Sequence, residues 1–179
     1  MTTIIRPATP ADARPLSELG ATTLRDAFGS MNDPDDMDRY IADAFTPTRQ
    51  AAEIADPAGL VLLAEHTPTT GGAELIGYAQ LVAGAPPPAI AGPAPMELKR
   101  FYVMRAWHGR GVAQLLMNSA LDEARARGAI TIWLGVWERN PRAIAFYTKY
   151  GFRRAGERIR RLGGDAQTDW LLARSLGDG

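Results

Sequence analysis

The sequence predicts an α/β fold in which helices flank a mixed, mostly antiparallel sheet of about seven strands. Apolar residues repeat with a helical period in some segments and form short strand-like runs in others. A short strand and several helices come first, two turn-linked strands follow, and a strand–helix–strand–helix–strand series and a last strand complete the chain. Turn-linked strands are typical of antiparallel pairs, and the alternating series is typical of an α/β sheet.

The first part of the chain contains a strand and three helices. Residues 3–6 form a short strand that a proline ends, and residues 9–12 (Thr-Pro-Ala-Asp) have the sequence of a capping box. The residues at helical spacing after this cap are Ala13, Leu16, Leu19, Gly20 and Leu24. A second helix starts at residues 32–34, and a short third helix covers residues 46–56. The apolar face of the second helix contains Met37, Tyr40, Ile41 and Phe45.

The middle of the chain changes to a strand pattern. Residues 60–64 and 75–82 are compact apolar strands, and the turn-rich stretch 67–72 between them predicts a hairpin. Residues 84–95 contain five prolines among small residues, which predicts a semi-rigid loop at the surface. Neither side of this loop has a convincing core of its own, so we expect a single domain over residues 1–179.

The second half of the chain alternates between strands and helices. The expected elements are a strand over residues 96–104, a helix ending near 127, a strand over 129–136, a helix over 140–150, and strands over 154–161 and 167–174. Gly128 is the expected cap at the end of the long helix.

The composition restricts the class of protein and its partners. The 179 residues are 46% hydrophobic and 22% charged, which is ordinary for one globular domain. Twenty basic and twenty acidic residues give a net charge of zero, and there is no nucleic-acid-binding motif, so we expect no nucleic-acid partner. Neither a signal-peptide pattern nor a run approaching the ~20 apolar residues of a membrane span is present. We therefore expect a cytoplasmic protein without a membrane partner.

The chain has no cysteine and only two histidines, His66 and His108. The absence of cysteine excludes disulfides, thiolate zinc ligands and a cysteine acyl-enzyme. No remaining side chains have the spacing of metal ligands, so no metal is expected.

The most informative segment is residues 107–113, where a strand ends and a helix begins. Gly109 and Gly111 allow a tight turn and a close approach to a ligand, because neither has a Cβ. The first turn of a helix has N–H groups without partners and a partial positive charge. Together these features predict a site for an anion, most simply a pyrophosphate, to which Arg110 adds charge. The alternative is an ordinary strand-to-helix turn, because short glycine motifs are weak signals.

A second informative segment covers residues 140–152. Asn140 and Tyr147 are seven residues apart, about two helical turns, and therefore share one face of the helix. Taken singly, Asn140 fits a helix N-cap, and Tyr147 fits a half-buried aromatic residue beside Ile144.

The order of these segments resembles the GNAT superfamily of N-acetyltransferases. The resemblance rests on a strand, a Gly-x-Gly helix start, another strand, and then Asn-Pro-x-Ala-x-x-Phe-Tyr-x-x-x-Gly-Phe, and it covers residues 96–152 closely. The family's phosphate loop has Arg or Gln, two residues, Gly, one residue, and Gly or Ala; His108, Gly111 and Ala113 occupy these positions, and His108 departs from the pattern. The resemblance implies the GNAT fold, with a splayed pair of central strands, and an acetyl-CoA-dependent N-acetyltransferase.

Other stretches resemble the PaiA-type branch, whose members acetylate polyamines such as spermidine. These stretches are residues 134–143, the helix with Tyr40 and Phe45, and residues 164–169. This resemblance implies a small-molecule amine acceptor, with spermidine and spermine as candidates, and it is compatible with a homodimer.

The family resemblance also implies a role for each matching residue. The backbone of residues 101–103 lines the pantetheine arm, and residues 108–113 hold the pyrophosphate. Asn140 hydrogen-bonds the cofactor, and Lys149 lies near its phosphates. Tyr147 is the general acid beside the thioester sulfur. The implied cofactor-binding residues are thus Phe101, Tyr102, Val103, His108, Gly109, Arg110, Gly111, Val112, Ala113, Asn140 and Lys149.

The chemistry of amide formation adds further requirements. Negative charge develops on the thioester oxygen and is met by a fixed N–H group, such as that of Val103. The leaving thiolate has a pKa of roughly 8.5, so a phenol can protonate it, whereas the attacking amine has a pKa near ~10 and must lose a proton first. Glu97 and Glu138 are the candidate bases, acting through water. The alternative for either carboxylate is a solvated charge at a strand end.

Four acids, Asp33, Asp35, Asp36 and Asp38, crowd the start of the second helix. They would attract a cationic substrate, but acids also favour a helix N-terminus, where the dipole stabilises them.

Two other functions stay open: acetylation of a protein or peptide, and a non-catalytic module that binds acyl-CoA.

Overall fold

The computed structural model describes residues 1–162 and 165–177. In chain order its elements are β1 (Thr2–Pro7), η1 (Pro10–Asp12), α1 (Ala13–Phe28), η2 (Gly29–Met31), α2 (Pro34–Ala44), α3 (Pro47–Ala55), β2 (Gly59–Thr67), β3 (Glu74–Ala83), β4 (Pro95–Val103), η3 (Arg105–Trp107), α4 (Val112–Ala126), β5 (Thr131–Trp137), α5 (Pro141–Lys149), β6 (Arg153–Leu162) and β7 (Asp165–Ser175). The hydrogen-bonded strand order is β1-β2-β3-β4-β5-β7-β6, which confirms the predicted seven-stranded α/β fold.

The chain divides into two compact units. The first contains residues 1–81 and 100–120, and the second contains residues 82–99 and 121–179. The boundary passes through β3, β4 and α4, so β4 contributes its end to the first unit and its start to the second. The single domain expected from the sequence stays a prediction.

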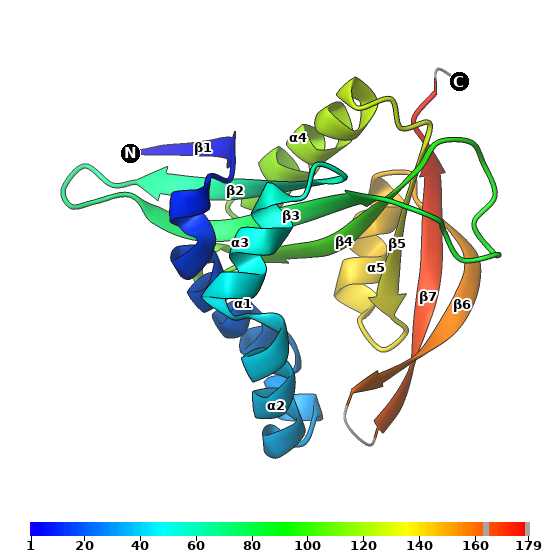
Figure 1. Ribbon diagram of the computed structural model, residues 1–179, viewed down its shortest axis with the longest axis horizontal. Helices are drawn as coiled ribbons and strands as arrows, with labels where there is room; N and C mark the ends of the chain where they lie inside the picture. The colour runs from blue at the N-terminus through cyan, green and yellow to red at the C-terminus, as the bar shows by residue number, and fades with distance from the viewer. Residues whose placement is uncertain (163–164, 178–179) are drawn as a thin grey trace. The chain divides into compact units, whose positions relative to one another are not determined.

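The first unit combines the N-terminal strands with α1, α2 and α3. β1 pairs antiparallel with β2, and α3 packs against both α1 and β2 (Figure 1). The apolar positions predicted for α1 are buried, and a Cβ at Gly20 would overlap the ring of Phe45. Phe45 itself lies directly after α2, where it is buried. Gly20 is therefore a point of close approach between α1 and the chain that follows α2.

Asp12 connects the start of α1 to β1 and β2. Its carboxylate accepts hydrogen bonds from the backbone N–H of Thr9 at 2.7 Å and from the guanidinium of Arg6 at 2.8 and 2.9 Å. Arg6 also donates to Glu65 on β2 at 2.8 Å. The hydrogen bond from Arg6, more than any other contact, holds the pKa of Asp12 well below its usual range. The predicted capping box is confirmed, and it is coupled to an ion pair that the sequence did not indicate.

The second unit is built on β5, β7 and β6, which form consecutive antiparallel pairs (Figure 1). β4 runs parallel to β5, but the pairing covers only Pro95–Glu97 opposite Thr131–Trp133. The two strands therefore pair only over their first residues, which confirms the predicted splayed centre of the sheet. Of the stretch 164–169 quoted for the PaiA-type resemblance, residue 164 lies outside the described residues.

The proline-rich stretch 84–95 is an irregular surface segment, as its composition predicts, except at Ile90. Ile90 is buried in a cluster with Trp133 and Leu171, and Ala89 lies so close to Gly156 that a Cβ there would be 2.5 Å away. The composition correctly predicts an irregular segment but not that its one large apolar residue packs onto the sheet. No described helix has the length and apolar character needed to cross a membrane.

We expect Asp12→Asn to destabilise the protein by about 2 kcal/mol at neutral pH, because Arg6 would lose a charged partner. The folded-state pKa of Asp12 is lowered, so its contribution is complete above the ordinary aspartate pKa and is lost as the pH falls below it. Chemical denaturation from pH 7 to pH 2 should therefore show the gap between wild type and variant closing below about pH 4.

Asp38→Asn is the matched control, since Asp38 forms an exposed ion pair with Arg25. Its effect should stay below about 1 kcal/mol. A gap between wild type and Asp12→Asn that does not change with pH would contradict the role given to the ionised carboxylate.

Candidate functional site

The predicted phosphate loop lies in the first unit, between the end of β4 and the start of α4. The turn η3 is followed by Gly109 with φ +77° and Gly111 with φ +83°, in the left-handed region that favours glycine. Apart from the glycine and its two chain neighbours, no atom of the described residues lies within 4 Å of the position that a Cβ would take at either glycine. The backbone conformation thus requires glycine, and the space beside it is open to a ligand.

The start of α4 supplies the electrostatic part of this site. α4 begins at Val112 and is 15 residues long, so its first N–H groups have no intrahelical partner and carry the positive end of the helix dipole. Val112 is buried, and its side chain packs with Ala64 and Ile76. The helix start is therefore held in place by the core, and its open backbone fits a pyrophosphate.

The side chains of two loop residues, His108 and Arg110, contact neighbouring groups. The Nε2 atom of His108 lies 2.9 Å from the carbonyl oxygen of Val103, the last residue of β4. The guanidinium of Arg110 lies 5.3 Å from the ring centroid of Trp107. The rings of Trp107 and His66 are in contact as well, with their centroids 4.4 Å apart. His108 thus ties the loop to β4, a function that differs from a contact with phosphate.

The end of β4 is fixed from one side by β3. A Cβ at Gly77 would be 2.9 Å from the carbonyl oxygen of Tyr102, and the rings of Tyr78 and Tyr102 stack at 5.7 Å. Phe101, Tyr102 and Val103 are all half-buried. The strand proposed to line the pantetheine arm therefore has a rigid support.

Arg100, which the sequence analysis did not single out, anchors the same strand. Its guanidinium is 2.5 Å from the carboxylate of Glu53 on α3 and 3.1 Å from the side-chain oxygen of Gln80, and it lies over the ring of Phe45. Only 9% of the Arg100 side chain is exposed. β4 also contains the charged residues Glu97 and Lys99, so its sequence has no signal that is specific to this anchor.

The segment around α5 lies in the second unit and has the predicted cap. The side-chain oxygen of Asn140 accepts a hydrogen bond from the N–H of Ala143 at 3.1 Å, which leaves the amide NH₂ as the group that can donate to a cofactor. Tyr147 is buried, with the Phe152 ring at 5.8 Å, and Lys149 is exposed at the end of the helix. The local interpretations of Asn140 and Tyr147 as cap and packed aromatic are thus correct, and they are compatible with the functional ones.

The two candidate bases differ in their surroundings. Glu97 lies in the three-residue parallel pairing of β4 and β5, and 23% of its side chain is exposed. Burial raises the pKa of Glu97, and the positive charges of Arg158 and Lys99 partly offset this. Glu138 is exposed directly after β5. A partly buried carboxyl with a raised pKa fits a proton acceptor better than a solvated one does.

Arg158 is a candidate functional residue that the sequence analysis missed. Arg158 lies on β6. Its guanidinium is 5.9 Å from the centroid of the Trp133 ring on β5 and 4.0 Å from the carboxylate of Glu97 on β4. It also lies 3.6 Å from Asp169 on β7, which in turn is 3.2 Å from Arg160. Arginines two residues apart in the predicted strand 154–161 were a signal for one charged face, but not for its reach across the sheet.

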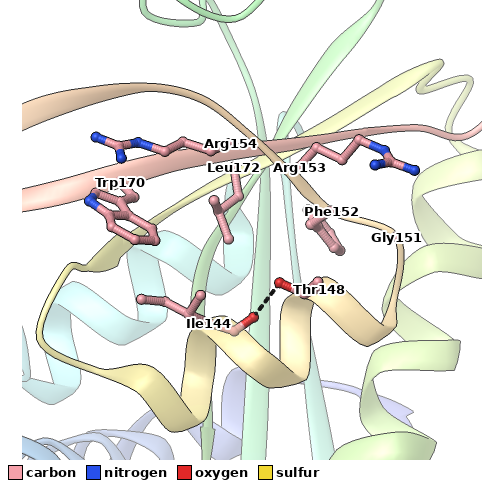
Figure 2. A pocket seen from close by; sticks show the side chains of 8 residues that line it. All are labelled: Ile144, Thr148, Gly151, Phe152, Arg153, Arg154, Trp170 and Leu172. Carbon is pink, nitrogen blue, oxygen red and sulfur yellow. Dashed lines mark hydrogen bonds between the residues drawn. The ribbon is translucent and has the colours of Figure 1, made fainter.

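A cavity of about 390 Å³ also lies in the second unit, between α5 and the strands β6 and β7. Ile144 and Thr148 approach it from the helix, and Trp170 and Leu172 approach it from β7 (Figure 2). None of the residues predicted for the active site lines this cavity. Within the described residues, no three potential metal ligands gather either.

Three of the four acids at the start of α2 have structural partners. The carboxylate of Asp33 accepts hydrogen bonds from the N–H groups of Asp35 and Asp36 and so caps the helix. Asp36 pairs with Arg39, and Asp38 pairs with Arg25 at 2.9 Å. Asp33 is thus a helix cap, and the charges of Asp36 and Asp38 are already partly neutralised.

Comparisons with known proteins identify the family. The model of the acetyltransferase (GNAT) family matches residues 22–152. An N-acetyltransferase of Mycobacterium tuberculosis that is described as uncharacterised is 32% identical over 165 residues, 92% of this chain and 98% of that protein. The N-alpha-acetyltransferase RimI of the same species is 31% identical over 136 residues, 76% of this chain and 78% of that protein.

Solved structures have the same fold at lower identity. The PaiA N-acetyltransferase of Thermoplasma acidophilum, solved with coenzyme A, has a TM-score of 0.73 and 18% identity over 98% of this chain and 99% of that one. The spermidine/spermine N-acetyltransferase SpeG of Vibrio cholerae has a TM-score of 0.66 and 19% identity over 98% and 95%. The chain therefore belongs to the acetyltransferase (GNAT) family and is an acetyl-CoA-dependent N-acetyltransferase.

Proposed function

We propose that this enzyme acetylates a primary amine of a small molecule by direct attack of the amine on the acetyl-CoA thioester. The observation that carries this proposal is the carboxyl of Glu97, which is partly buried at the parallel β4–β5 pairing and has a raised pKa. Such a group can accept the proton that an ammonium must lose before it attacks. The absence of cysteine from the chain agrees with a mechanism without a cysteine acyl-enzyme.

The assignment of cofactor-binding residues follows the family pattern. Residues 108–113 bind the pyrophosphate, and the open left-handed glycines and the start of α4 support this. Residues 101–103 bind the pantetheine arm through their backbone. Asn140 donates its amide NH₂ to the cofactor, and Lys149 adds positive charge near the phosphates. The side chain of His108 serves this site indirectly, by holding the carbonyl of Val103.

The chemical step transfers one acetyl group; two protons leave the substrate nitrogen, and one proton is given to the sulfur. Glu97, directly or through a water molecule, takes a proton from the substrate ammonium, and the free amine nitrogen then bonds to the thioester carbonyl carbon. The N–H of Val103 stabilises the negative charge on the carbonyl oxygen. The carbon–sulfur bond breaks, and the phenol of Tyr147 protonates the leaving thiolate. The attacking nitrogen loses its second proton to water as the amide forms. The products are an N-acetylated amine and free CoA; Tyr147 recovers its proton from solvent, and Glu97 releases its proton to solvent.

Polyamines are one acceptor class within this proposal, because PaiA and SpeG have the same fold. Likeness in fold at this identity does not extend to the substrate. Three of the four aspartates that would attract a polycation, Asp33, Asp36 and Asp38, cap α2 or pair with arginines. We therefore propose the wider class of small primary amines and not polyamines in particular.

A second candidate acceptor is the α-amino group of a peptide or protein. The observation that favours it is the 31% identity to the N-alpha-acetyltransferase RimI. A non-catalytic acyl-CoA-binding module has less support, because binding alone gives no reason for a partly buried carboxyl with a raised pKa.

Replacement of Tyr147 by Phe should lower kcat about 10²- to 10⁴-fold, because the leaving thiolate loses its proton donor. Affinity for acetyl-CoA, measured by calorimetry, should change little. Tyr150→Phe on the same segment is the control and should retain turnover. Wild-type turnover in the Tyr147→Phe variant would remove Tyr147 from the mechanism.

Replacement of Glu97 by Gln should lower kcat by a similar factor, because glutamine cannot accept the proton. Since the pKa of Glu97 is raised, the acid limb of the wild-type profile of kcat/KM should lie above the ordinary range of a glutamate. Glu138→Gln is the matched control and should be nearly as active as wild type. If Glu138→Gln were the more damaging change, the base would be Glu138 instead.

A Gly111→Ala substitution should weaken acetyl-CoA binding at least about tenfold, a loss of about 1.4 kcal/mol. An alanine is strained at φ +83°, and its methyl group would enter the space proposed for the phosphates. Gly29→Ala is the control, because Gly29 has φ −60° and open space around it. Equal affinities in calorimetry would argue against this loop as the phosphate site.

A further inference from the structure

We propose that the amine substrate carries an anionic group close to its amine, as an α-amino acid does, and that Arg158 binds this anion beside Glu97. This inference rests on the proposed function, because it assigns Glu97 to the amine. It goes further by naming the substrate class and a residue that determines specificity. All the residues that carry it lie in the second unit.

The path of the Arg158 side chain is the first observation. Arg158 lies on β6 opposite Asp169 of β7, yet its guanidinium extends past β7 to β5 and β4. A Cβ at Gly135 of β5 would be only 2.6 Å from the Nη2 atom of Arg158. The guanidinium therefore occupies space that is open because residue 135 has no side chain, and it ends near the carboxyl of Glu97.

The second observation is that the N–H groups of the Arg158 guanidinium form no hydrogen bond with the described residues. Its Nε atom is 3.6 Å from Asp169 and its Nη1 atom is 4.0 Å from Glu97, and both distances are longer than a hydrogen bond. Arginine has five N–H donors, and within residues 1–162 and 165–177 no hydrogen bond from this one is present. A planar fork of donors with 37% of the side chain exposed is suited to a carboxylate, which it can bind through two parallel hydrogen bonds.

Charge around the guanidinium favours an anion as well. Asp169 is shared between Arg158 and Arg160, and only 4% of its side chain is exposed. One buried carboxylate thus faces two guanidinium groups, which leaves a surplus of positive charge. Glu97 offsets this surplus only when it is ionised, and burial opposes its ionisation. A substrate carboxylate would balance the charge that remains.

A neighbouring donor supports the same interpretation. The indole Nε1 of Trp133 is buried and, among the described residues, has no hydrogen-bond partner. A buried N–H without an acceptor is costly unless a ligand or water supplies one. Trp133 lies beneath the guanidinium of Arg158, so the unused donors of the two residues belong to one region of the sheet.

The spacing sets the size of the substrate's polar end. Glu97 and Arg158 are 4.0 Å apart, so the amine and the anion that they bind must be close together in one molecule. An α-amino acid, with one carbon between nitrogen and carboxyl, meets this condition. A polyamine would instead bring further cations towards Arg158 and Arg160, and like-charge contacts of this kind exclude a ligand.

The test compares matched amines that differ in charge, with release of free CoA as the readout. Phenylalanine, its amide and phenethylamine have the same ring and the same amine position, but only the first has an anion; spermidine and a short peptide complete the panel. We expect kcat/KM for the amino acid to exceed that for the amide by about ten- to a hundredfold. Equal values for acid and amide, or a preference for spermidine or the peptide, would overturn the inference and leave the acetyltransferase intact.

Three variants separate specificity from catalysis. Arg158→Met should remove the preference for the acid mainly through KM, and turnover of the amide should persist. Gly135→Ala keeps the charge but displaces the guanidinium, and it should give an intermediate loss. Arg154→Met is the control on the same strand, because Arg154 pairs with Glu157 and lies over Trp170. An unchanged preference for the acid in Arg158→Met would overturn the role of Arg158.

A binding measurement keeps the two proposals distinguishable. Calorimetry of phenylalanine with the enzyme–CoA complex should show binding that Arg158→Met weakens about tenfold or more. If no amine on the panel releases CoA, the proposed function fails, and this binding alone decides the inference. Equal binding of acid and amide, or no binding of either, would overturn it.

Discussion

The short parallel pairing between β4 and β5 is the constraint on which the proposed chemistry depends. The pairing covers three residues of each strand, although β4 has nine residues and β5 has seven. The residues proposed to bind the pantetheine arm, 101–103, lie beyond this pairing, at the other end of β4. In this proposal the arm binds through the backbone of β4, so the binding surface needs no special side chains.

The backbone and the side chains have different tasks in the proposed site. The proposed phosphate loop depends on two glycines with positive φ and on the start of α4, which are features of the main chain. A departure at His108 from the family's Arg or Gln therefore does not remove the site. The imidazole instead binds the carbonyl of Val103, which couples the loop to the strand proposed to hold the pantetheine arm. Side chains are needed for proton transfer and for selection of the acceptor.

The sequence predicts the elements well and the long-range contacts poorly, for physical reasons. Helix starts at Thr9, Asp33 and Asn140 depend on neighbouring residues, so local rules identify them. The burial of Ile90 depends on Trp133 and Leu171, which are 43 and 81 residues away in the sequence, and no local pattern encodes it. The choice between Glu97 and Glu138 is of the same kind. Glu97 lies within a segment with an ordinary strand pattern, and Glu138 comes directly after another such segment. Only the sheet order and burial distinguish a carboxyl at the β4–β5 pairing from one in solvent.

The fold and the local charge constrain different partners in the reaction, the acetyl donor and the acceptor amine. Enzymes with this fold act on very different amines, so the fold constrains the acetyl donor far more than the acceptor. Discrimination between acceptors arises where a wrong ligand would leave a charge unpaired or repelled. In the second unit such a point exists at Arg158, whose guanidinium has open donors beside one carboxyl and beside an indole N–H without a partner among the described residues. An acceptor that satisfied Glu97 alone would leave the positive surplus of the two arginines uncompensated, whereas an acceptor with its own anion would satisfy both.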